Sequence, residues 1–135
     1  MTSREKRKII EETAEKLFWQ TSFNKRTTNF FHDGAWEKEK REFYVSFERT
    51  SPAGDEVELT EFYDRLDDIP GKLYERYTDF DADEYVYGWL EAKRDGVSGV
   101  PGVRTLVEDA EWQEQAILDL SIALRDAMNE AEARA

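Results

Sequence analysis

The sequence predicts an α+β fold, and three observations lead to this prediction. Apolar residues recur at helical spacing near both ends of the chain, they alternate with polar residues over residues 42–49, and turn-forming residues separate these segments. A chain of 135 residues is long enough for one hydrophobic core and too short for a large multidomain assembly. We therefore expect one domain over residues 1–135.

The first expected element is a helix over residues 4–20. Thr2, with Glu5 three residues later, forms a capping-box pattern at its start. The apolar side chains at helical spacing predict which face packs on the rest of the molecule. They are Ile10, Ala14, Leu17 and Phe18.

Residues 21–40 show no clear period. Large aromatic side chains occur there, but charged residues and the turn signal at Asp33 and Gly34 interrupt them. We expect irregular structure in this segment, with room for a short strand. The N-terminal helix and this irregular segment make up residues 1–42, and residues 43–135 form an acidic module of a hairpin followed by helices.

A β-hairpin is expected next. Residues 42–49 alternate, with Phe43, Val45 and Phe47 on one face, and turn residues follow over 50–55. Val57 and Leu59 continue the pattern as a second strand. The acidic residues between them predict a hairpin, or a small antiparallel sheet, with one acidic face exposed to water. These residues are Glu56, Glu58 and Glu61.

Three helices complete the expected fold. Asp67 or Asp68 can cap the first, where Pro70 occupies an early position and needs no N–H donor. Asp81 or Asp83 can cap the second. Apolar residues at helical spacing then predict one long amphipathic helix from Val103 to Ala133.

Composition excludes several classes of function. The 31 acidic and 19 basic residues give a formal net charge of -12, the wrong sign for direct binding to nucleic acid or an anionic membrane. The absence of cysteine and the single His32 exclude disulfides, thiol nucleophiles and multi-histidine metal sites. The chain contains no apolar run long enough for a membrane span and no signal-peptide pattern. We expect a cytoplasmic protein with no membrane contact, no metal and no cofactor.

Catalytic and ion-binding patterns are weak. If Asp79 is position 1 of a calcium loop, Glu84 stands where glycine is required and Leu90 where a bidentate glutamate is required. His32 beside Asp33 has no accompanying nucleophile motif. We therefore expect a protein that is not an enzyme and has no catalytic residues.

The acidic residues are concentrated in one part of the chain. Residues 1–44 carry a net charge of +2 and residues 45–135 a net charge of -14. Residues 55–84 alone contain twelve acidic residues and three basic ones. An uneven distribution of this kind favours a surface that attracts basic partners.

Two stretches carry a resemblance to a known group of proteins. Residues 77–84 with the following Trp89, and residues 99–111, resemble the C-terminal module of small acidic proteins carried by phages and integrative elements of gut bacteria. The hairpin loop over residues 51–55 resembles the same group, and the similarity spans residues 43–130. The resemblance implies a product of a mobile element, similar in kind to antirestriction and anti-CRISPR proteins. It supplies no catalytic residues.

Charge and resemblance together lead to one expected function. The chain would be a non-enzymatic inhibitor of bacterial defence that imitates nucleic acid and blocks a basic nucleic-acid-handling protein, a CRISPR effector or restriction complex. The alternative is an acidic adaptor or assembly protein that binds through an exposed Trp112 and an apolar patch. A homodimer formed through the long final helix also stays open. The expected partner-binding residues are Glu56, Glu58 and Glu61 on the hairpin, Asp67, Asp68, Asp79, Asp81, Asp83 and Glu84 at helix starts, and Glu108, Glu111, Trp112 and Glu114 on the final helix.

Overall fold

The computed structural model describes the backbone of residues 1–135 and every side chain except those of Phe30, His32, Glu37, Lys38 and Glu39. It confirms the α+β class and the long final helix. The elements in chain order are α1 (Ser3–Lys16), β1 (Gln20–His32), β2 (Ala35–Thr50), β3 (Glu56–Tyr63), the single 3-10 turn η1 (Leu66–Asp68), α2 (Ile69–Asp79), α3 (Ala82–Arg94) and α4 (Val103–Arg134).

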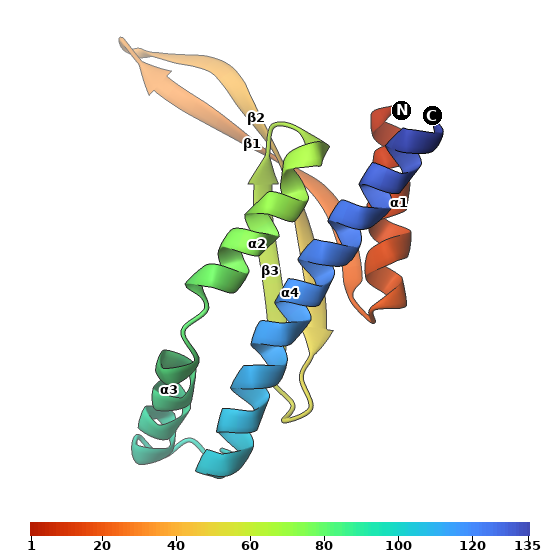
Figure 1. Cartoon of the computed structure of the whole chain (residues 1–135). Coiled ribbons are helices and arrows are strands. Elements are labelled where there is room, and N and C mark those ends of the chain that lie inside the picture. Colours follow the sequence, from red (N-terminus) through yellow and green to blue (C-terminus); the bar gives the residue numbers. More distant parts are fainter.

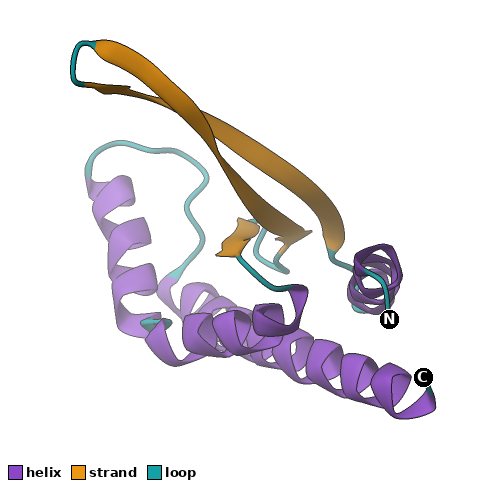
Figure 2. Cartoon of the chain, turned by 90° about the horizontal axis from the view of Figure 1, so that it is seen from above, coloured by secondary structure: helices purple, strands orange, loops and turns teal.

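The three strands form one antiparallel sheet in the order β1-β2-β3. Helices α1, α2 and α4 lie along one side of this sheet, as Figures 1 and 2 show. The opposite face of the sheet carries no helix. This is a two-layer arrangement, in which one sheet face meets the core and the other faces water.

The core lies between the sheet and α4. Val45 and Phe47 point inward from β2 and are fully buried, as is Leu73 of α2. Their partners on α4 recur every three or four residues, which is the spacing of one helix face. The buried apolar residues of α4 are Leu106, Ala110, Ala116, Ile117, Leu120, Leu124 and Met128.

Residues 20–40 differ from the sequence prediction. They form two antiparallel strands, paired from Gln20 with Glu48 to His32 with Ala35 with one change of register between Thr28 and Phe30, where we expected irregular structure. Asp33 and Gly34 have φ of 49° and 77°, the pair of positive values that a two-residue type I′ hairpin turn requires. The outer half of this hairpin extends beyond the body as an arm (Figure 1), so no core imposes an apolar period on it.

The first helix is shorter than predicted. Its capping box is present, because Thr2 Oγ1 accepts from the Glu5 backbone N–H at 3.2 Å and the Glu5 carboxylate accepts from Thr2 at 3.3 Å. The helix ends at Lys16, and the residue expected to extend its apolar face, Phe18, has φ of 69° and is 78% exposed. The backbone N–H of Phe18 and that of Trp19 bond back to carbonyls of the last turn, which is a Schellman ending.

Candidate functional site

One buried carboxylate organises the end of the molecule at which α4 begins. Asp109 of α4 is 3% exposed and accepts four hydrogen bonds. Its Oδ2 accepts from Ser51 Oγ at 2.9 Å, from Tyr85 Oη at 2.7 Å and from Gln113 Nε2 at 3.0 Å. Its Oδ1 accepts from the backbone N–H of Ala53 at 3.0 Å. These bonds join the β2–β3 loop, α3 and α4.

The same bonds set the ionisation of the cluster. Burial by itself raises the pKa of Asp109, but the hydrogen bonds from Tyr85, Ala53, Gln113 and Ser51 outweigh it and hold this pKa below its usual value. Burial, followed by the hydrogen bond to Asp109, raises the pKa of Tyr85. Asp109 is therefore an ionised structural anchor.

The Asp109 cluster brings together acidic residues that are far apart in sequence. The β2–β3 loop, the start of α3 and the first part of α4 meet there, at the lower end of the molecule in Figure 1. We call the exposed or half-exposed carboxylates of these segments, together with the last residue of α2, the acidic end. It consists of Asp55, Glu56, Asp79, Asp81, Asp83, Glu84, Glu108, Glu111 and Glu114.

Few of these carboxylates are neutralised. Glu108 pairs with Arg104 at 3.3 Å, and Asp81 accepts from the Glu84 backbone N–H at 3.0 Å as the N-cap of α3. Within the described part of the chain, no other member of the acidic end forms an ion pair with Lys or Arg. The acidic end therefore presents charge to solvent.

The open face of the sheet adds a second acidic group. Glu48 of β2 and Glu58 of β3 are directly opposite each other in the register, and both are exposed. Glu56 lies on the same face one pair further along. Like charges at opposed cross-strand positions destabilise a sheet, so packing alone does not account for this arrangement.

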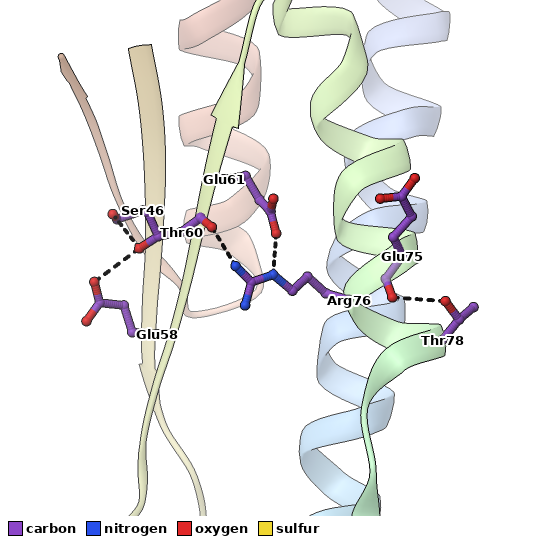
Figure 3. A network of polar contacts seen from close by, with 7 residues as sticks. All are labelled: Ser46, Glu58, Thr60, Glu61, Glu75, Arg76 and Thr78. Carbon is purple, nitrogen blue, oxygen red and sulfur yellow. Dashed lines mark hydrogen bonds and ion pairs between the residues drawn. The ribbon is translucent and has the colours of Figure 1, made fainter. Parts of the chain in front are cut away.

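Glu61 does not belong to that face, which corrects the predicted hairpin surface. Positions 56, 58 and 60 share one face of β3, and 61 lies on the other, because side chains alternate along a strand. Its Oε1 accepts from Arg76 Nε at 2.5 Å, and Arg76 Nη2 donates to the Thr60 carbonyl at 2.7 Å (Figure 3). Glu61 thus fastens α2 to the sheet edge.

The two acidic residues just before α2 that we expected to bind a partner, Asp67 and Asp68, differ in their contacts. Asp67 accepts from Lys6 Nζ at 2.9 Å and from Arg65 Nη2 at 3.2 Å. The hydrogen bond from Lys6 is the main cause of the lowered pKa of Asp67. Asp68 is exposed and its side chain does not cap α2. Asp67 is therefore a tether between α1 and η1, and Asp68 alone is free for a partner.

Trp112 is half-buried, not an exposed anchor. It packs against the core, and the Arg49 guanidinium lies 4.5 Å from the centre of its ring. Burial in this aromatic setting lowers the pKa of Arg49, and Asp119 acts in the opposite direction. Trp112 therefore packs against the core and the Arg49 guanidinium.

Sequence reasoning missed Asp109 as a structural residue, although the signal was present. Asp109 and Gln113 fall three and seven residues after Leu106, on the face of α4 that is otherwise apolar. A carboxylate and an amide at core positions indicate a buried polar network.

Comparison with protein-family models, with curated proteins and with solved structures found no match. Among the described residues, no three acidic or histidine side chains are grouped as a metal site requires. None of the described helices combines the length and the apolar character that crossing a bilayer would need.

Proposed function

We propose that this chain is a non-enzymatic inhibitor from a phage or mobile element that occupies the basic nucleic-acid groove of a bacterial defence protein. The expected target is a CRISPR effector or a restriction complex. The acidic end, with Glu48 and Glu58 of the open sheet face, is the proposed contact surface.

One observation carries this proposal: exposed carboxylates, most of them without an ion-pair partner among the described residues, are gathered on segments that a buried network holds rigidly. Asp109 fixes the loop, α3 and α4 relative to one another through four hydrogen bonds. A pre-organised charged surface avoids the cost of ordering side chains and loops on binding. Its field also steers a basic partner and weakens as salt is added.

The spacing of the carboxylates favours imitation of a short stretch of phosphates over imitation of a whole DNA duplex. Alternate residues of a strand lie about 6.8 Å apart, whereas phosphates along one DNA strand recur about every 3.4 Å of axis. Glu56 and Glu58 are spaced in this wider way. The proposed surface therefore competes for some of the phosphate contacts of the groove, and its affinity is expected to fall with added salt less steeply than that of a short nucleic acid.

The alternative function, an acidic adaptor or assembly protein, has less support, because its expected anchor Trp112 is half-buried against the Arg49 guanidinium. An interface hot spot needs a side chain that the partner can enclose. We therefore retain the acidic surface as the basis of function.

A phage-plating assay tests the proposal in cells. The protein is expressed in bacteria that carry one defined CRISPR or restriction system, and plaques are counted beside those on cells that lack the system. A triple variant, Asp79→Asn, Asp83→Asn and Glu111→Gln, removes three exposed charges of the acidic end. A matched control removes three exposed charges of α1, through Glu11→Gln, Glu12→Gln and Glu15→Gln.

The proposal predicts that the wild-type chain and the α1 control restore plaques on a susceptible system, and that the acidic-end variant does not. Equal activity of the two triple variants would contradict a role for the acidic end. Circular dichroism of both variants establishes that folding is unchanged.

A further inference from the structure

The β1–β2 arm ends in an uncovered aromatic pair. Phe31 and Trp36 are cross-strand neighbours beside the turn, with ring centres 5.4 Å apart in an edge-to-face arrangement. They are 62% and 72% exposed. An exposed pair of this kind on a soluble protein indicates a contact surface.

The same chain contains a groove that such a pair could fill. It lies between the start of α2 and the second half of α4, and has a volume of about 520 Å³. Pro70, Tyr74 and Met128 provide apolar lining. Arg65 and Arg125 border the groove together with the acidic Asp67 and Glu132. An indole ring suits this environment, because guanidinium groups stack favourably on aromatic faces.

The walls of this groove are fixed in place. Ser121 Oγ donates to the Pro70 carbonyl at 2.8 Å, which ties the first turn of α2 to α4. Ser121, Pro70 and Met128 are buried, whereas Tyr74 is 51% exposed. A groove with fixed walls and an open side is preformed for an incoming side chain.

The arm cannot fill the groove of its own chain. Figures 1 and 2 show it leaving the body on the sheet side, away from α2 and α4. We propose that a second copy of this chain provides the missing partner: each arm tip inserts into the α2–α4 groove of the other copy. Two reciprocal contacts of this kind form a closed, two-fold symmetric dimer.

The area of contact is sufficient for a dimer. Covering the exposed parts of one Phe and one Trp removes roughly 300 Å² from water, since each aromatic side chain offers roughly 150–250 Å². With a similar area from the groove and two contacts per dimer, the total is roughly 1,200 Å², which is at the lower limit of stable interfaces.

Charge also permits this arrangement. The parts of β1 and β2 that form the arm lie within residues 20–44, which carry five basic and four acidic side chains, a net charge of +1, so the least acidic part of one copy approaches the other. The proposed dimer does not depend on the proposed function, and dimerisation and binding to a basic partner should respond to salt in opposite directions. Salt screens the repulsion between two chains of charge -12, so the dimer is expected to persist or strengthen as salt is added.

Variants at the two surfaces test the proposal. The arm variant is Phe31→Ala with Trp36→Ala. The groove variant is Gly71→Gln, because a Cβ at Gly71 meets nothing within 4 Å and its φ is not positive, so the new side chain enters the groove without disturbing the fold. Gly88→Gln on α3 is the matched control, since a Cβ at Gly88 also meets no atom within 4 Å.

The measurement is sedimentation equilibrium from about 1 µM to about 1 mM, a range that covers weak to moderate affinities. The proposal predicts dimers for the wild-type chain and the Gly88 control, and a dissociation constant raised at least about tenfold for the arm and groove variants, a loss of about 1.4 kcal/mol or more. A mixture of the two variants restores one of the two contacts, so it should associate more tightly than either variant alone and more weakly than the wild-type chain.

Three results would overturn the proposal. The first is a wild-type chain that stays at 15.9 kDa over the whole range. The second is a dimer that neither variant weakens. The third is a dimer that the arm variant abolishes but Gly71→Gln leaves intact, which would place the tip on another surface of the second copy.

Discussion

Replacing Asp109 with asparagine is expected to destabilise the fold strongly. In its better orientation, the new amide keeps its carbonyl towards Ser51, Tyr85 and Gln113 and turns its NH₂ towards the Ala53 N–H. That backbone donor loses its partner inside the protein, at a cost of about 1–3 kcal/mol. The three remaining bonds lose their charge assistance, worth roughly 0.5–1 kcal/mol each. The expected loss is about 2.5–6 kcal/mol.

A loss of this size is a large part of a typical stability of about 5–15 kcal/mol. For a chain of this length it lowers Tm by roughly 10–20 °C. Urea denaturation followed by far-ultraviolet circular dichroism measures the change in free energy of unfolding directly.

Asp126→Asn is the matched control, because it makes the same chemical change on the same helix. Asp126 is exposed, and its ion-pair partner among the described side chains is its neighbour Arg125, at 3.2 Å. Its replacement is expected to change stability by less than about 0.5–1 kcal/mol. If Asp109→Asn cost no more than Asp126→Asn, the Asp109 cluster could not be what holds the acidic end together.

Three further predictions concern the acid limb, the end of α1 and the sheet face. Because the pKa of Asp109 is lowered in the folded state, its contribution to stability is complete above the unfolded pKa of about 3.9 and is lost as pH falls through the folded pKa. Asp109→Asn should therefore reduce the loss of unfolding free energy at acidic pH, as urea titrations at several pH values would show. Phe18→Gly should raise stability by about 0.5–1 kcal/mol, since glycine adopts positive φ without strain, whereas Phe18→Ala should give no such gain in the same denaturation assay. Glu48→Lys should stabilise the sheet by about 0.2–1 kcal/mol by pairing with Glu58, and adding Glu58→Lys should abolish the gain, as thermal melts would show.

The fold could be predicted from the sequence in the segments where packing against the core makes apolar residues recur at a regular spacing. Residues 42–49 and α4 pack against the core, and their alternation and helical spacing were readable for that reason. The arm was missed because neither of its faces meets a core, so its strands are held by backbone pairing and by the turn at Asp33 and Gly34.

The candidate site was predicted less completely, because charge counts do not show which carboxylates have partners. Glu61 and Asp67 bind Arg76 and Lys6, which lie 15 and 61 residues away in sequence. The face of Glu61 was nevertheless readable, since it breaks the two-residue period of Glu56 and Glu58. The hydrogen-bond partners of Asp109 could not be predicted, because they depend on where the β2–β3 loop lies.

The most direct test of the central claim is a pull-down at low and high salt. The wild-type chain and the two triple variants serve as bait in a lysate of cells with one intact defence system, and DNA or guide RNA is added as competitor. We expect the wild-type chain and the α1 control to recover the defence complex at low salt, added salt or nucleic acid to remove it, and the acidic-end variant not to bind it. Recovery of the complex by all three proteins, unaffected by salt and by nucleic acid, would contradict the claim that the acidic end occupies a nucleic-acid groove.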